Sequence, residues 1–191
     1  AAFGLPALHL VEPDEKKIQV VVLSPTRELA TQIADDLRRF GKNIKGLKVA
    51  TVYGGASIET QIREIKRGVQ IVVATPGRLC DLINRKRIDI SNVSYAILDE
   101  ADEMLNMGFK DDLDFILSHT PEEKFTWLFS ATMPKEVRRI AKNYMTDPLE
   151  VTVGKVNSSN ENIEHKYFLV HDRDRYAGLK RVLDFYPDIF G

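Results

Sequence analysis

The chain has 191 residues, of which 43% are apolar and 29% are charged, a balance typical of a globular domain with a sizeable core. Its 27 basic and 28 acidic residues leave a net charge of -1, which excludes a protein that coats nucleic acid by bulk charge but allows a local basic face. The single cysteine, Cys80, excludes a disulfide framework and a cysteine-based metal site.

Short apolar runs alternate with segments of helical periodicity along most of the chain. The run 18–23 predicts a first strand, and the apolar residues from Leu29 to Phe40 then recur at helical spacing. The alternation continues with strands predicted at 48–53, 70–74, 95–98 and 125–129, helices between them, and a last strand at 149–153. This order predicts an α/β fold in which an open parallel sheet carries helices on both faces.

The polar segment 154–162 is typical of a linker. After it, 163–170 alternates as a strand does, and Tyr176, Leu179 and Leu183 share one helical face. One strand and one helix cannot form a domain, so we predict a first domain at 1–153 and the beginning of a second at 163–191.

Three predicted strands end in turns that open directly into helices. The turn residues are Pro25, Thr26 and Arg27 after the first strand, Gly54 and Gly55 after the second, and Thr75, Pro76, Gly77 and Arg78 after the third. Helix N-termini attract phosphate oxygens, glycine allows close backbone approach, and arginine adds charge-assisted hydrogen bonds. Three such turns along one sheet edge can follow a nucleic-acid strand, although each turn alone is equally ordinary capping chemistry, with Thr75 at the N-cap and Pro76 at N1.

Charge is segregated along the sequence although the total is nearly neutral. Residues 44–67 contain five basic and two acidic residues, and 78–87 contain four basic and one acidic, whereas 99–124 contain two basic and nine acidic. We interpret the basic stretches as facing nucleic acid, with a merely solvated loop at 85–87 as the alternative.

The predicted strand 95–98 runs directly into Asp99, Glu100, Ala101 and Asp102. Two adjacent carboxylates at the tip of a buried strand form a Walker B arrangement, in which the first holds hydrated Mg²⁺ and the second accepts a proton from the attacking water. An acid-rich helix N-terminus is the structural alternative. The next strand ends in Ser130, Ala131 and Thr132, whose hydroxyls can bridge neighbouring loops.

Together these motifs resemble those of the DEAD-box RNA helicases, a branch of helicase superfamily 2, and the resemblance covers nearly the whole chain. Residues 25–30 are similar to motif Ia, Gly54-Gly55 to the glycine doublet, 75–78 to motif Ib, 99–102 to the motif that names the family, and 130–132 to motif III. The resemblance implies a RecA-like lobe, with 163–191 beginning a second such lobe.

The resemblance also implies a role for each motif. Asp99 would position Mg²⁺–ATP, in part through water, and Glu100 would activate the hydrolytic water. Ser130, Ala131 and Thr132 would act with Asp102 to couple the ATP state to RNA strand separation. Contacts to the RNA backbone, without reading sequence, would come from Pro25, Thr26, Arg27, Gly54, Gly55, Thr75, Pro76, Gly77 and Arg78.

The sequence departs from this family in that no Gly-x-x-x-x-Gly-Lys-Ser/Thr phosphate loop occurs in it. The family's upstream glutamine motif, which reads adenine, and its second-lobe motifs are missing too. We therefore expect that the chain starts just after that loop, lacks the first strand of the lobe, and hydrolyses no ATP by itself. The expected activity of the intact protein is ATP-dependent RNA unwinding. Alternatives are a non-catalytic RNA-backbone-binding module and a DNA-directed superfamily 2 translocase.

The expected setting follows from the composition and the resemblance. No apolar run approaches the ~18 residues of a membrane span, so we expect no membrane partner. The partner we expect is RNA, the protein is expected to be a monomer, and the cytoplasm is the expected location, with the nucleus left open.

Overall fold

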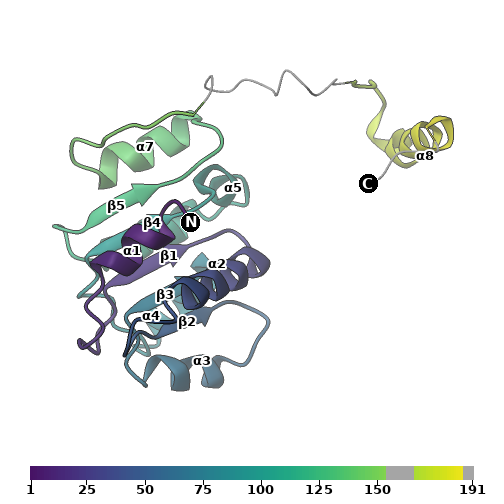
Figure 1. Ribbon diagram of the computed structural model, residues 1–191. Coiled ribbons are helices and arrows are strands. Elements are labelled where there is room, and N and C mark those ends of the chain that lie inside the picture. Colours follow the sequence, from purple (N-terminus) through teal and green to yellow (C-terminus); the bar gives the residue numbers. More distant parts are fainter. Residues whose placement is uncertain (154–165, 187–191) are drawn as a thin grey trace. The chain divides into compact units, whose positions relative to one another are not determined.

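The computed structural model describes residues 1–153 and 166–186, which belong to two separate compact units. The first unit contains a five-stranded sheet in which every pair of neighbouring strands is parallel (Figure 1). Its strands are β1 (Val20–Leu23), β2 (Val49–Val52), β3 (Ile71–Ala74), β4 (Tyr95–Leu98) and β5 (Phe125–Leu128), in the order β2-β3-β1-β4-β5. This confirms the predicted α/β class.

All strands point the same way, so the turns that follow them lie at one edge of the sheet, here called the carboxyl edge. The loops that lead into the strands lie at the opposite edge, the amino edge. β1 occupies the middle position, between β3 and β4. The chain therefore changes its direction of winding next to β1, and in open α/β sheets ligands bind beyond the carboxyl ends of strands at such a point.

One face of the sheet is covered by α1 (Gly4–Leu10) and α2 (Arg27–Phe40). The buried residues Ala30, Ile33, Ala34 and Leu37 recur along α2 at helical spacing and pack against Val20, Val22, Ile71, Val73 and Ile97 of the sheet. α2 begins at Thr26, whose hydroxyl oxygen accepts a hydrogen bond from the N–H of Leu29 at 3.2 Å.

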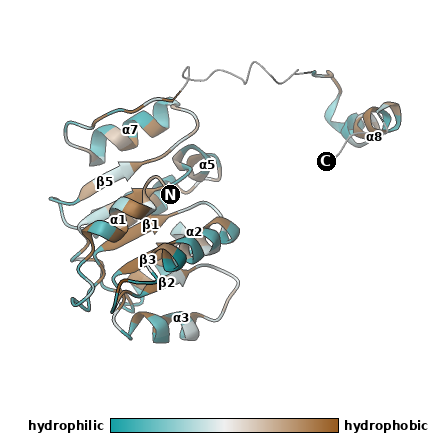
Figure 2. Ribbon diagram, viewed as in Figure 1, coloured by the Kyte–Doolittle hydropathy of each residue, from teal (hydrophilic) through white to brown (hydrophobic). Residues whose placement is uncertain are grey.

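The other face is covered by the remaining helices of the unit. These are α3 (Ile58–Ile65), α4 (Pro76–Asn84), α5 (Ala101–Asn106), α6 (Lys110–Ser118) and α7 (Lys135–Tyr144). Their apolar residues, such as Leu79, Met104 and Leu113, form the second core cluster with the alternate side chains of the strands. Figure 2 shows brown, hydrophobic residues along β1 and β3, whereas α2 and α7 are largely teal and hydrophilic. The predicted helices on both faces are confirmed.

The strand predicted at 149–153 is wrong. This segment has no regular secondary structure, and Leu149, Val151 and Val153 are 88%, 77% and 96% exposed. Their apolar alternation suits a strand, but a strand also needs a neighbour to receive its backbone hydrogen bonds. No described strand pairs with this segment.

The second unit, by itself, contains a 3₁₀ turn, Asp172–Asp174, followed by α8 (Arg175–Phe185). α8 confirms the predicted helix, and Tyr176, Leu179 and Leu183 on it are exposed. Residues 166–170 form no strand, which corrects the described part of the strand predicted at 163–170. The predicted linker 154–162 and residues 163–165 lie outside the described residues. Among the helices of the described part, none has the length and apolar character needed to cross a membrane.

Candidate functional site

The three predicted turns meet at the carboxyl edge. The backbone N–H of Ser24 donates to Ala74 at 3.0 Å, and the N–H of Thr75 donates to Val52 at 2.9 Å, so each strand end is bonded to the next. The guanidinium of Arg27 lies 4.8 Å from the centre of the Tyr53 ring, across the end of β3. The predicted alignment of the turns along one edge is thus confirmed.

A buried glutamine holds the turn that contains the glycine doublet. Gln61 on α3 is 5% exposed, and its amide N–H donates to the carbonyl of Tyr53 at 3.0 Å. Its Oε1 accepts from Arg78 at 3.1 Å, and Arg78 also donates to the carbonyl of Ala56 at 3.1 and 3.2 Å. Gln61 and Arg78 together therefore brace the turn on both sides of Gly54 and Gly55.

Sequence reasoning missed Gln61, although a signal existed. It lies three residues after Ile58 and four before Ile65, on the face of α3 that is otherwise apolar. A lone amide in such a position is buried, and a buried amide requires hydrogen-bond partners.

The other turn residues differ in how accessible they are. Pro25 and Pro76 are buried and shape their turns, with Pro76 in the first turn of α4 as predicted. Thr75 lies at the predicted N-cap, but its side chain makes no capping hydrogen bond. Gly54 and Gly77 are exposed, and a Cβ built on either would meet nothing within 4 Å, so a ligand can approach the backbone there.

The paired carboxylates follow β4 at the same edge. Glu100 adopts left-handed backbone angles, φ 52° and ψ 52°, which are uncommon outside glycine and concentrate at functional sites. Its side chain is exposed, whereas Asp99 is half-buried. Burial, and then the neighbouring charge of Glu100, raise the pKa of Asp99.

This donor set fits a hydrated Mg²⁺. A cation would relieve the burial and repulsion that raise the pKa of Asp99, and Mg²⁺ needs one or two carboxylates because it keeps most of its water. Within the described ranges, no group of three or more His, Cys, Asp or Glu side chains is arranged as a direct metal cage. Asp99 and Glu100 would therefore hold Mg²⁺ together with water and phosphate oxygens.

Asp102 links the end of β4 to the end of β5. Its carboxylate accepts hydrogen bonds from the hydroxyl of Thr132 at 2.6 Å and from the N–H of Thr132 at 2.9 Å. The hydroxyl of Ser130 accepts the N–H of Asp102 at 3.3 Å and donates to the carbonyl of Thr132 at 2.7 Å. Burial opposes ionisation of Asp102, but these hydrogen bonds outweigh it and lower the pKa. Ala131, which lies between Ser130 and Thr132 in the chain, is exposed.

The basic stretches that we interpret as facing nucleic acid lie for the most part away from these turns. Residues 45–48 and 66–67 lead into β2 and β3, and 85–87 precede β4, so all lie toward the amino edge. Of the basic residues in those stretches, Arg78 reaches the carboxyl-edge turns. The reason is topological, because helices carry the chain back from one edge to the other between strands.

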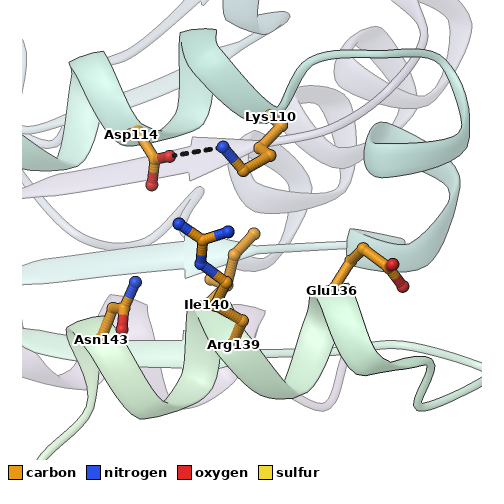
Figure 3. Close-up of a pocket in the computed structure, with 6 residues that line it drawn as sticks. All are labelled: Lys110, Asp114, Glu136, Arg139, Ile140 and Asn143. Atoms are coloured by element: carbon orange, nitrogen blue, oxygen red, sulfur yellow. Dashed lines mark ion pairs between the residues drawn. The ribbon is translucent and has the colours of Figure 1, made fainter.

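A small cavity of about 30 Å³ lies between α6 and α7 (Figure 3). In this view Arg139 points from α7 toward Asp114 of α6, which pairs with Lys110 at 3.5 Å. Tyr144 also donates to Asp114, at 2.7 Å. The cavity has room for about one water molecule, so its role is to pack the two helices rather than to bind a nucleotide.

The structure is thus a parallel α/β lobe with the paired carboxylates Asp99 and Glu100 at its carboxyl edge. The neighbouring Asp102 is hydrogen-bonded to the two hydroxyl residues that follow the next strand, Ser130 and Thr132. Residues 1–140 match the model of the DEAD/DEAH box helicase family. The match covers well over half of the chain, and the protein belongs to this family.

Individual relatives are similar over nearly the whole chain. The DEAD-box ATP-dependent RNA helicase CshA of Streptococcus pneumoniae serotype 4 is 47% identical over 184 residues, which make up 96% of this chain and 35% of that protein. CshA of Bacillus subtilis is also 47% identical over 184 residues, covering 96% of this chain and 37% of that protein. The chain thus spans about a third of the length of these curated relatives.

A solved structure of a related protein supports the fold of the first unit. The crystal structure of a DEAD box protein from the hyperthermophile Methanococcus jannaschii is similar with a TM-score of 0.76 and 44% identity, over 95% of this chain and 48% of that chain. The first unit is therefore a RecA-like DEAD-box lobe with an all-parallel five-stranded sheet.

Proposed function

We propose that the protein containing this chain is an ATP-dependent RNA helicase that couples ATP hydrolysis to local RNA unwinding or remodelling of RNA–protein complexes. The observation that carries the proposal is the bonded link from Asp102 to Thr132, at 2.6 and 2.9 Å, beside the paired carboxylates. It joins the strand that bears Asp99 and Glu100 to the next one, so a change at the nucleotide is transmitted to the neighbouring turn.

In this proposal the acidic residues divide the chemistry. Asp99 would hold Mg²⁺–ATP, in part through water and with help from Glu100, and the bound nucleotide would supply the phosphoanhydride that is cleaved. Glu100, exposed beside it, accepts the proton of the attacking water. Asp102 holds Thr132 and Ser130 in place.

The turns at the carboxyl edge would hold RNA through its sugar-phosphate backbone. Exposed Arg27 and the accessible backbone at Gly54, Gly55 and Gly77 would make direct contacts, together with half-buried Thr26 and Thr75. Pro25, Pro76 and Arg78 would act by fixing the shapes of the turns. Such contacts carry no base information, so binding is expected to be independent of sequence.

We propose the domain assignment on the same basis. Residues 1–153 are assigned to the first RecA-like lobe, 154–162 to a linker and 163–191 to the beginning of a second lobe. The separate second unit, and the exposed apolar side chains of Leu179 and Leu183 on α8, support this assignment, because such a face is buried in a complete domain. We further propose a monomer that works in the cytoplasm, where ATP and RNA are both abundant.

The 191-residue chain has no phosphate loop, which in related enzymes cradles ATP phosphates through several charge-assisted bonds of ~1.5–3 kcal/mol each. We therefore expect RNA-stimulated ATP hydrolysis from a longer protein that includes this loop, and none from the chain by itself. Hydrolysis by the purified chain would contradict this expectation.

The test of the proposed function is Glu100→Gln in such a longer protein. Loss of the general base is expected to lower the RNA-stimulated ATPase rate by about 10²–10⁴-fold, measured as phosphate release. Glu103→Gln is the matched control, since Glu103 is exposed one residue beyond Asp102 and is expected to change the rate less than twofold. An unchanged rate in Glu100→Gln would remove its assigned role.

The two alternatives predict different results in the same assay. A non-catalytic RNA-binding module would bind RNA without any stimulated hydrolysis. A DNA-directed translocase would be stimulated more by DNA than by RNA at one fixed salt concentration.

A further inference from the structure

The amino edge of the sheet carries a basic surface that the proposed helicase chemistry does not use. The loops that lead into β1, β2 and β3, residues 11–19, 41–48 and 66–70, contain seven basic and three acidic residues. The turns of the carboxyl edge, 24–28, 53–57, 75–78, 99–103 and 129–135, contain three basic and five acidic residues. The charge that attracts a polyanion is therefore concentrated at the opposite edge from the chemistry. We define the amino-edge surface as Lys16, Lys42, Lys45, Lys48, Lys66 and Arg67.

A buried glutamine fixes these three loops to one another. Gln70 is 1% exposed, and its Oε1 accepts the N–H of Lys48 at 2.9 Å. Its Nε2 donates to the carbonyls of Pro13 at 2.9 Å and Glu15 at 3.0 Å. One side chain thus joins the loops before β1 and β2 to the start of β3.

Two further contacts tighten the same arrangement. The Nζ of Lys48 donates to the carbonyl of Arg67 at 2.7 Å, which ties the loop before β2 to the loop before β3. Gly68, at φ 75°, lies so close to Lys16 that a Cβ on it would come within 2.9 Å of the Lys16 side chain. The loops that carry the basic residues are consequently held in place relative to one another, which lowers the entropic cost of binding to them.

Most of these charges are unpaired. Lys42, Lys45, Lys66 and Arg67 are exposed, and in the part of the chain that the structure describes their side chains form no ion pair. Of the three acidic residues in these loops, Glu15 is taken by Lys17 at 2.7 Å. The surface is therefore a cluster of available cations on loops that are fixed to one another.

We propose that the amino-edge surface binds the phosphate backbone of RNA, so that a flanking part of the RNA held at the carboxyl edge is anchored here. This inference rests on the proposed function. Neutralisation of phosphates by Lys and Arg releases counterions and supplies sequence-independent affinity. The carboxyl edge, with three basic and five acidic residues, supplies less of this affinity than the amino edge. None of the large exposed apolar side chains of the described residues lies in these three loops, whereas a membrane-binding surface inserts such side chains.

The test compares two charge-matched variants of the whole chain. The amino-edge variant is Lys45→Gln, Lys66→Gln and Arg67→Gln, which spares Lys48 and Lys16 because they hold the loops together. The control variant is Arg139→Gln, Lys142→Gln and Lys180→Gln, three exposed residues that belong to none of the loops and turns listed for the two edges. Affinity for a fluorescent single-stranded RNA of about 30 nucleotides is measured from about 0.05 to 0.5 M salt.

The amino-edge variant is expected to reduce the slope of log affinity against log salt by about 2, because each lost phosphate contact removes about 0.7. At about 0.1 M salt its affinity should fall on the order of a hundredfold, while the control variant keeps the slope of the unmodified chain. Circular dichroism of both variants verifies that they fold.

Three results would overturn the inference, and they are distinguishable from one another. If the unmodified chain binds RNA and both variants behave alike, the amino edge does not anchor RNA, and the proposed function stands. If the unmodified chain binds no RNA, the RNA contacts of the proposed function fail as well. If the amino-edge variant loses affinity for vesicles of anionic phospholipid or for an acidic peptide, and keeps its affinity for RNA, the surface serves that other partner.

Discussion

The two edges of the sheet are made by the same five short strands but carry opposite chemistry. The carboxyl edge gathers Asp99, Glu100 and Asp102 and is acidic, whereas the amino edge gathers lysines and is basic. The acidic groups that would hold a metal and activate water weaken the attraction of RNA by bulk charge at their own edge, so RNA there would depend on local contacts with the turns. An α/β fold can thus keep metal chemistry and bulk attraction of phosphate apart by placing them at opposite ends of its strands.

Each edge is braced by one buried glutamine, and the two differ in what they hold. Gln70 makes three hydrogen bonds to backbone groups of the amino-edge loops. Gln61 makes two at the carboxyl edge, one of them with Arg78. The first fixes the positions of cations, and the second fixes the shape of a turn without adding charge.

The largest effect on stability is expected from Gln70→Leu, which removes the brace of the amino edge. It leaves two carbonyls and one N–H without partners in a buried setting, which costs about 1 kcal/mol for each bond and so about 2–4 kcal/mol of unfolding free energy. Urea unfolding of the chain measures it. Gln32→Leu, on the exposed side of α2, is the control and should change stability by less than about 0.5 kcal/mol. Equal stability of the two variants would show that the three bonds are replaced by water.

Sequence reasoning succeeded where the signal is local. Ile71–Ala74 is buried on both faces, so its unbroken apolar run identified a central strand. The hydroxyls of Ser130 and Thr132 were expected to bridge loops, and they reach Asp102. Motif order placed the three turns at one edge because parallel strands leave no other arrangement.

Sequence reasoning failed where the partner is distant in the chain. Gln70 bonds residues 55 and 57 positions away, and no local pattern identifies those partners. The charge pattern did not indicate at which edge the basic stretches lie, because the chain returns to the opposite edge of the sheet between strands. The segment 149–153 has the alternation of a strand, but whether such a segment pairs depends on a neighbouring edge rather than on its own residues.

A smaller effect is expected from Gln61→Leu, which loosens the turn around Gly54 and Gly55 and frees Arg78. RNA affinity should fall about three- to tenfold, because a bracing bond of ~0.5–1.5 kcal/mol is lost. The salt dependence should stay unchanged, since no cation is removed. Gln32→Leu again serves as the control. A reduced salt slope in Gln61→Leu would show that the two edges are not independent.

The smallest effect on stability is expected from removing the charge of Asp99 or of Asp102, two carboxylates of the carboxyl edge that are expected to act in opposite directions. The pKa of Asp99 is raised, first by burial, so ionisation of Asp99 destabilises the folded chain. This destabilisation develops as the pH rises through the folded pKa of Asp99. Although burial opposes it, the pKa of Asp102 is lowered by hydrogen bonds from Thr132 and Ser130. The stabilisation of the folded chain by ionised Asp102 is therefore present above the ordinary Asp pKa of about 3.9 and is lost as the pH falls through the lower folded pKa.

At pH 7 without metal, Asp99→Asn should therefore raise the midpoint of thermal unfolding and Asp102→Asn should lower it, each by a few degrees at about 2–4 °C per kcal/mol. The difference for Asp99→Asn should shrink as the pH falls through the raised folded pKa toward about 3.9, and the difference for Asp102→Asn should shrink only as the pH falls below about 3.9. Asp111→Asn, whose side chain is 99% exposed, is the control and should shift little. If Asp99→Asn also lowered the midpoint at pH 7, Asp99 would be a carboxylate that stabilises the fold. The idea that the carboxyl edge is destabilised by a charge placed there to hold a cation would then be wrong.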